Sequence, residues 1–159
     1  MFERFAQAAR VAVDDARYEA ARRGDRRIGT DHLLISLLED ESNATALGVD
    51  AGAARAAADG LDRAALAAVG VDADVFGTSG RPPAGRHMPL TAGAKTFMGD
   101  TLTQAAAEKA RSITPRHMML AILERHEPDP AAVLLGALAV DVPAARERLA
   151  DTADAGHGK

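Results

Sequence analysis

The stretch Ile28-Gly-Thr-Asp-His-Leu-Leu-Ile-Ser-Leu-Leu-Glu39 returns later in the chain as Ile113-Thr-Pro-Arg-His-Met-Met-Leu-Ala-Ile-Leu-Glu124. The shift is 85 residues (113 − 28); two aliphatic residues, a histidine and the final glutamate are identical, and every apolar position stays apolar. A second pair, Val49–Arg55 and Val140–Arg146, is shifted by 91 residues (141 − 50), so the second copy carries six more residues between the blocks. The chain is an internal duplication, and we expect each copy to bury its apolar face against the other.

The composition of the 159 residues favours helices packed closely in a single domain. Alanine is abundant, aromatic residues make up only 3% of the chain, and tryptophan is absent. The formal net charge is −4, and the basic residues are scattered, which argues against nucleic-acid binding. The one basic cluster is expected at the solvated end of a helix rather than in a phosphate-binding patch: Arg22, Arg23, Arg26 and Arg27.

The cellular compartment follows from three features of the sequence. With no cysteine, the chain has no disulfide framework, redox thiol or thiolate metal site. The first residues, Met1–Phe5, lack the apolar core of a signal peptide, and no run approaches the roughly 18 apolar residues of a membrane span. We therefore expect a cytoplasmic protein without a membrane partner.

Apolar residues at three- and four-residue spacing predict four helices in each copy. The first runs from about residue 2 to 23, and Thr30 is expected to cap the second, as Thr114 does in the second copy. The third helix is expected to be a single turn at most over Ser42–Leu47 and longer in the second copy, and the fourth to break at Gly60. The predicted fold is all-α, with two pseudo-twofold-related four-helix repeats in one compact domain.

The domain boundaries are placed by the duplication and by a segment rich in Pro and Gly. The first repeat is expected at 1–76, a linker at 77–89, the second repeat at 90–151 and a flexible tail at 152–159. The linker is assigned from composition, because it contains no apolar periodicity.

Catalytic motifs are missing from the sequence. It contains no phosphate-binding loop, no nucleophile elbow and no metalloprotease motif. His32 and His117 are expected to be hydrogen-bonded structural residues, because neither has a second ligand three or four positions away. No catalytic residue, metal or cofactor is therefore predicted, and the chain is not expected to be an enzyme.

Three stretches together resemble the N-terminal domain of the Clp unfoldases, closest to the ClpC type, over about residues 1 to 150. They are Met1-Phe-Glu-Arg-Phe5, Ile28-Gly-Thr-Asp-His-Leu-Leu34 and His87-Met-Pro-Leu-Thr-Ala-Gly-Ala-Lys95. The resemblance implies a double repeat in front of an ATPase ring, which receives substrate proteins or adaptors without chemistry of its own.

The resemblance also implies a site for phosphorylated arginine at the start of each second helix. There, an acidic side chain faces the guanidinium and the helix start lies near the phosphate. The first copy keeps these parts as Thr30 and Asp31, although aspartate is one methylene shorter than the family's glutamate. The second copy has Thr114 and Arg116, and an arginine repels a guanidinium, so we expect one weakened site and one altered or lost site.

A second surface of the family binds cyclic peptide antibiotics and adaptors in some members. Its positions correspond to Phe2, Leu90 and Lys95, with a leucine in place of an aromatic residue. Phe2 is equally explained as a core anchor, and Leu90 is better explained as a packing residue.

Alternatives remain open for the whole chain. As a stand-alone Clp N-domain, which the altered Arg116 and the short third helix favour, it would bind substrates, degrons or small molecules as an adaptor, decoy or buffer. As an excised fragment, it would be the recognition domain of a full-length Clp ATPase. The rival class, an enzyme or a small-molecule-binding protein on the same fold, needs a buried polar cluster between the repeats, for which only His32 and His117 are available.

Overall fold

The computed structural model describes residues 3–71 and 87–156, with side chains as far as residue 153. Most of the predicted linker 77–89 therefore lies outside the described residues. Within them the chain forms eight α-helices, which confirms the all-α class, and none of these is long and apolar enough to cross a membrane. In chain order the helices are α1 (Gln7–Arg22), α2 (Thr30–Leu37), α3 (Glu41–Leu47), α4 (Ala51–Ala68), α5 (Ala92–Ala107), α6 (Pro115–Leu123), α7 (Pro130–Ala137) and α8 (Val142–Gly156).

Backbone hydrogen bonds between the repeats follow a pseudo-twofold axis. The amide of Ala6 donates to the carbonyl of Ile113 (2.8 Å), and the amide of Thr91, 85 residues beyond Ala6, donates to the carbonyl of Ile28 (2.9 Å). Two isolated parallel bridges form at the same places, Phe5 with Ile113 and Ile28 with Leu90. The segment before each first helix is thus paired with the segment before the other repeat's second helix.

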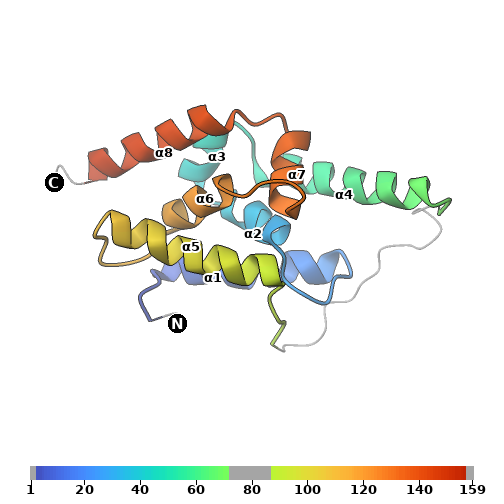
Figure 1. Cartoon of the computed structure of the whole chain (residues 1–159), viewed down its shortest axis with the longest axis horizontal. Helices are drawn as coiled ribbons and strands as arrows, with labels where there is room; N and C mark the ends of the chain where they lie inside the picture. The colour runs from blue at the N-terminus through green and yellow to red at the C-terminus, as the bar shows by residue number, and fades with distance from the viewer. Residues whose placement is uncertain (1–2, 72–86, 157–159) are drawn as a thin grey trace.

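The third helices cross between the repeats. α3 packs against α6 and α8 of the second repeat, and α7 packs against α2 and α4 of the first (Figure 1). The side-chain amide of Asn43 in α3 donates to the carbonyl of Pro115 (3.2 Å), and Arg148 in α8 donates to the carbonyl of Ala46 (2.9 Å). Because each repeat completes the other's bundle, the two share one hydrophobic core.

The core is centred on α2 and α6, which the other helices surround (Figure 1). Their fully buried side chains include Leu33, Leu34, Ile35, Leu37, Met118, Met119 and Ile122. α1 faces α2 with alanines that are fully buried, at Ala9, Ala16 and Ala20. Small side chains on this stripe allow the two helix axes to approach closely.

Several predicted boundaries are wrong. α1 begins at Gln7 instead of near residue 2, because Phe5 is already engaged in its bridge with Ile113. α3 has seven residues, nearly two turns, because Asp40 caps it by accepting from the Asn43 amide (3.0 Å). The two third helices therefore differ little in length. α4 continues unbroken through Gly60, and α8 includes residues 152–156 of the segment predicted as a tail.

Candidate functional site

A histidine occupies the third position of α2 and of α6, and it closes the start of each helix. His32 Nδ1 accepts from the amide of Gly29 (2.8 Å), and His117 Nδ1 accepts from the amide of Thr114 (2.9 Å). A nitrogen that accepts from a backbone N–H carries no proton, so the hydrogen on each ring resides on Nε2. The expectation of hydrogen-bonded structural histidines is confirmed.

The Nε2 atoms face carboxylates that come from different positions in the two repeats. His32 Nε2 lies 2.7 Å from Asp25 Oδ2, and His117 Nε2 lies 3.0 Å from Glu108 Oε2. A shift of 85 residues from Asp25 leads to Ala110, which has no carboxylate. The second repeat therefore obtains the same interaction from a different residue.

The first-turn residues of α2 and α6 form ion pairs of opposite polarity. Asp31 accepts from Arg23 Nη1 (2.6 Å), and Arg116 donates from Nη2 to Glu108. By the same shift of 85, Glu108 is the equivalent of Arg23, and Arg116 is the equivalent of Asp31. The basic and the acidic member of the ion pair have therefore changed places between the repeats. The reversed charge at Arg116 is thus matched by the reversed charge at Glu108.

The pKa values of the second network reflect its burial and its charges. Burial by itself raises the pKa of Glu108, but the hydrogen bond and charge of Arg116 outweigh it, with help from His117, and leave this pKa below its usual value. Burial lowers the pKa of His117, and the Glu108 carboxylate offsets only part of that effect. Both shifts favour a carboxylate beside a neutral imidazole near neutral pH.

Arg23 is more deeply buried than its place in a basic cluster indicated. Its side chain is only 9% exposed, and besides Asp31 it binds Asp62 of α4 through Nε (3.2 Å) and Nη2 (2.9 Å). The expectation of a solvated Arg23 is wrong, because two carboxylates compensate its burial. The shift of 85 could have identified Arg23 as a site residue, but nothing in the sequence pointed to Asp62.

A groove of about 340 Å³ opens beside this ion pair, and we call it the α4–α7 groove. Most of its lining comes from α4 of the first repeat and α7 of the second, and three of the lining residues are charged. The residues that line it are Arg23, Asp31, Ala58, Leu61, Asp62, Ala65, Pro130, Val133 and Leu134. Its lining combines apolar side chains with two carboxylates and one guanidinium.

Thr30 does not cap α2, whose N-cap residue is Gly29. The Thr30 hydroxyl instead donates to Asp129 Oδ1 (2.6 Å) and accepts from the amide of Ala131 (3.2 Å) at the start of α7. Thr114 does occupy the N-cap position of α6. Of the four residues predicted for a phosphoarginine-type site, Asp31 alone lines the groove.

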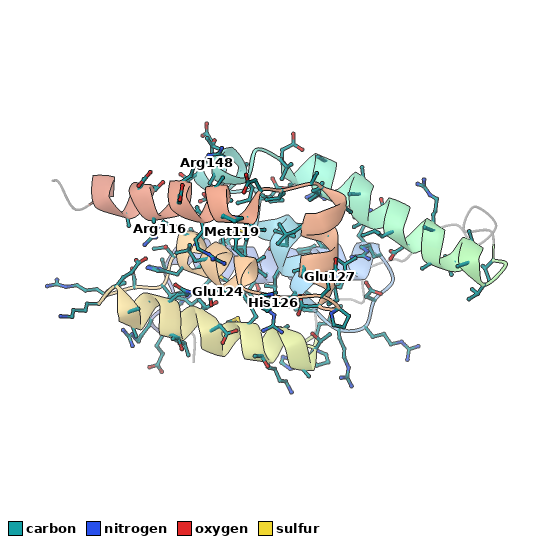
Figure 2. All side chains as sticks on the ribbon, turned by 45° about the horizontal axis from the view of Figure 1, so that its top comes forward. Arg116, Met119, Glu124, His126, Glu127 and Arg148 are labelled. Carbon is teal, nitrogen blue, oxygen red and sulfur yellow. The ribbon has the colours of Figure 1, made fainter. Side chains whose placement is uncertain are left out.

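Arg116 lies at the start of α6, close to α8 (Figure 2). Besides Glu108, it binds the carbonyl of Leu149 in α8 through Nη1 (3.3 Å). Its side chain is only 15% exposed, so its charge serves the connection between the two helices.

The predicted antibiotic-type surface is only partly visible. Phe2 lies outside the described residues. Leu90 is half-buried in its bridge with Ile28, and Lys95 is exposed on α5.

No protein-family model matches the chain. Among solved structures, the chain is similar to the crystal structure of the N-terminal domain of the caseinolytic protease-associated chaperone ClpD from Arabidopsis thaliana. The sequence identity is 20%, the TM-score is 0.72, and the match covers 96% of this chain and 99% of the other. The chain therefore has the fold of a Clp N-terminal domain, in agreement with the resemblance of its motifs.

Proposed function

We propose that this protein is a non-catalytic module that binds segments of other polypeptides, as the N-domain of a Clp unfoldase does. The observation that carries the proposal is the α4–α7 groove, which lies where the two repeats meet. Its lining includes apolar side chains such as Leu61 and Val133, and also Arg23, which binds both Asp31 and Asp62. An apolar slot with a few fixed charges suits a side chain of an extended segment.

The partners that this function implies are substrate proteins or their degrons. A Clp ATPase, a Clp protease or an adaptor is the wider assembly that we propose for it, with cyclic peptides as a further ligand class. We infer no catalytic role, because the two carboxylates that line the groove, Asp31 and Asp62, are engaged with Arg23, and the neighbouring His32 caps α2 and pairs with Asp25.

Phosphoarginine is a weak ligand in this proposal. At Asp31, a ligand guanidinium must compete with Arg23, which is already held at 2.6 Å. At Arg116, the ligand guanidinium meets a like charge, and proline at the first position of α6 removes a backbone donor. The first site is therefore weakened and the second is altered or lost.

The proposal is tested by titrating the isotope-labelled chain with free phosphoarginine and with a peptide that contains it, while backbone amide shifts are followed. We expect the largest shifts near Asp31 and along the groove-facing part of α4, and smaller ones in an Asp62→Asn variant. Glu41→Gln, a neutralised exposed residue of α3, serves as the control with the same change of charge. Shifts around Arg116 as large as those around Asp31, or none in the α4–α7 groove, would show the site assignment to be wrong.

A further inference from the structure

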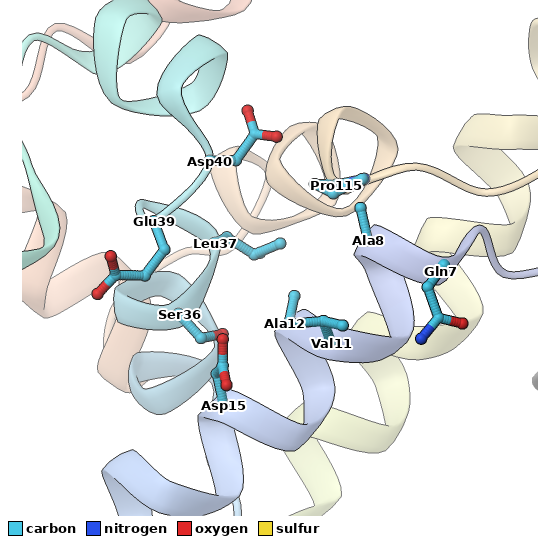
Figure 3. Close-up of a pocket in the computed structure, with 10 residues that line it drawn as sticks. All are labelled: Gln7, Ala8, Val11, Ala12, Asp15, Ser36, Leu37, Glu39, Asp40 and Pro115. Atoms are coloured by element: carbon cyan, nitrogen blue, oxygen red, sulfur yellow. The ribbon is translucent and has the colours of Figure 1, made fainter.

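A second groove, of about 390 Å³, lies between α1, the end of α2 and the first residue of α6 (Figure 3). We call it the α1–α2 groove. Its floor is apolar, and Val11 is 44% exposed there. The lining residues are Gln7, Ala8, Val11, Ala12, Asp15, Ser36, Leu37, Glu39, Asp40 and Pro115. Three of them are acidic, and no lysine or arginine is among those described.

The carboxylates of this groove are incompletely compensated. Arg55 donates to Glu39 (2.6 Å), and Asp40 accepts from the amide that it caps (3.0 Å). Among the described residues, Asp15 accepts no hydrogen bond and forms no ion pair. Burial raises the pKa of Asp15, and the neighbouring carboxylates, Glu39 first, raise it further. A cation placed in the groove would relieve this repulsion.

The second repeat shows what fills the equivalent place. The shift of 85 relates Asp15 to Asp100 and Asp40 to Arg125. Arg125 donates to Asp100 through Nη1 (3.3 Å) and to Asp129 through Nε (3.1 Å), and its side chain is 18% exposed. At the position equivalent to Ala8, a Cβ on Gly93 would lie 3.2 Å from Asp129 Oδ2, the carboxylate that holds Arg125 Nε, so the glycine leaves room for this pair.

The two repeats therefore differ in one respect at this place. The second holds a guanidinium from its own chain on Asp100. In the first, the one described guanidinium near the open groove, that of Arg55, binds Glu39 and leaves the equivalent carboxylate, Asp15, without a hydrogen bond from it. We propose that the α1–α2 groove binds an unmodified arginine side chain of a partner polypeptide.

In this arrangement, the guanidinium lies beside Asp15, in the role that Arg125 has on Asp100 in the second repeat. The aliphatic part of the arginine lies on the apolar floor near Val11 and Leu37. Arginine is favoured over lysine because its planar fork can donate two parallel N–H bonds to the Asp15 carboxylate. A phosphate on the arginine would add negative charge among three carboxylates, so this groove rejects phosphoarginine.

The preference for unmodified arginine separates this inference from the proposal for the α4–α7 groove. Either can fail alone, because the two grooves are lined by different residues and give separate sets of amide shifts.

The experiment titrates the labelled chain with a hexapeptide that carries one arginine between alanine and leucine residues. Versions with lysine or phosphoarginine at the same place are titrated in parallel. We expect saturable shifts in residues 7–15 and 36–40 with the arginine peptide, and at least tenfold weaker binding of the other two. Equal affinity of the three peptides, or shifts confined to other surfaces, would overturn the proposal.

Three variants sharpen the test. Asp15→Asn should lower the affinity for the arginine peptide about tenfold. Asp14→Asn, the same charge change at an exposed neighbour, should change this affinity less than twofold. Asp40→Arg copies Arg125 and should abolish binding by filling the groove. Circular dichroism checks that each variant is folded. Equal effects of Asp15→Asn and Asp14→Asn, or undiminished binding by folded Asp40→Arg, would contradict the assignment.

Discussion

Transplanting the ion-pair network of the first repeat into the second tests whether the two repeats are equivalent. The series consists of Arg116→Asp and Glu108→Arg singly, then the two together, and then both with Ala110→Asp. Residue 110 is the equivalent of Asp25, which binds His32 in the first repeat. The triple variant therefore contains counterparts of Arg23, Asp25 and Asp31 at their equivalent positions, although not of Asp62.

The magnitudes follow from the contacts that each step removes. Arg116→Asp removes the charged hydrogen bond to Glu108 and places two carboxylates together, which costs about 2–3 kcal/mol. Adding Glu108→Arg restores an ion pair but leaves His117 Nε2–H without its acceptor, a residual cost of about 1–3 kcal/mol. Ala110→Asp then supplies a new acceptor and should recover most of this loss.

The assay is urea unfolding followed by far-ultraviolet circular dichroism, which gives a free energy of unfolding for each variant. The predicted order of stability is the original chain and the triple variant first, then the double variant, and then Arg116→Asp. The reasoning is refuted if the changes in the free energy of unfolding caused by Glu108→Arg and by Arg116→Asp sum, within about 0.5 kcal/mol, to the change in the double variant. Independent sites are additive in that way.

Two further predictions concern the turn and the histidine of the second repeat. Lys109 has a φ of 54°, whereas its equivalent Gly24 has a φ of 77°, so Lys109→Gly should stabilise the chain by about 1 kcal/mol, read as a higher Tm. An unchanged or lower Tm would contradict this. The free energy of unfolding should fall as the pH drops below the unfolded histidine pKa of about 6.5, because the folded pKa of His117 is lower and the unfolded chain binds more protons. The variant His117→Gln keeps an acceptor for the Thr114 amide but does not titrate. The free energy of unfolding, measured with urea, should therefore vary less with pH between about pH 6.5 and 5 in this variant. An unchanged pH dependence would exclude His117 as the cause.

The fold was largely predictable because the duplication and the helical periodicity are local signals. The repeated block from Ile28 to Glu39 placed α2 and α6, and the alanine stripe of α1 was recognised from spacing alone. The errors arose where a tertiary contact decides a boundary. Phe5 pairs with Ile113 of the other repeat, so α1 starts later, and a cap from Asp40 lengthens α3.

The candidate site was less predictable, since it depends on pairs distant in the chain. Asp31 was selected as a site residue, but its partner Arg23 was expected in solvent. Arg116 was interpreted as a sign that the second site is altered or lost, and its partner Glu108 was not recognised. Comparing the two copies at Arg23 and Glu108 shows the exchange of charge. No sequence spacing shows that Asp62 of α4 completes the cluster, because helix packing alone brings it there.

The most direct test of the central claim uses a permanently unfolded polypeptide that carries both arginine and phosphoarginine. The labelled chain is mixed with increasing amounts of it, amide shifts are mapped, and the mass of the polypeptide is measured afterwards. The account predicts saturable shifts along the α4–α7 and α1–α2 grooves and a polypeptide of unchanged mass. Unperturbed grooves, or a polypeptide that has been chemically altered, would contradict it.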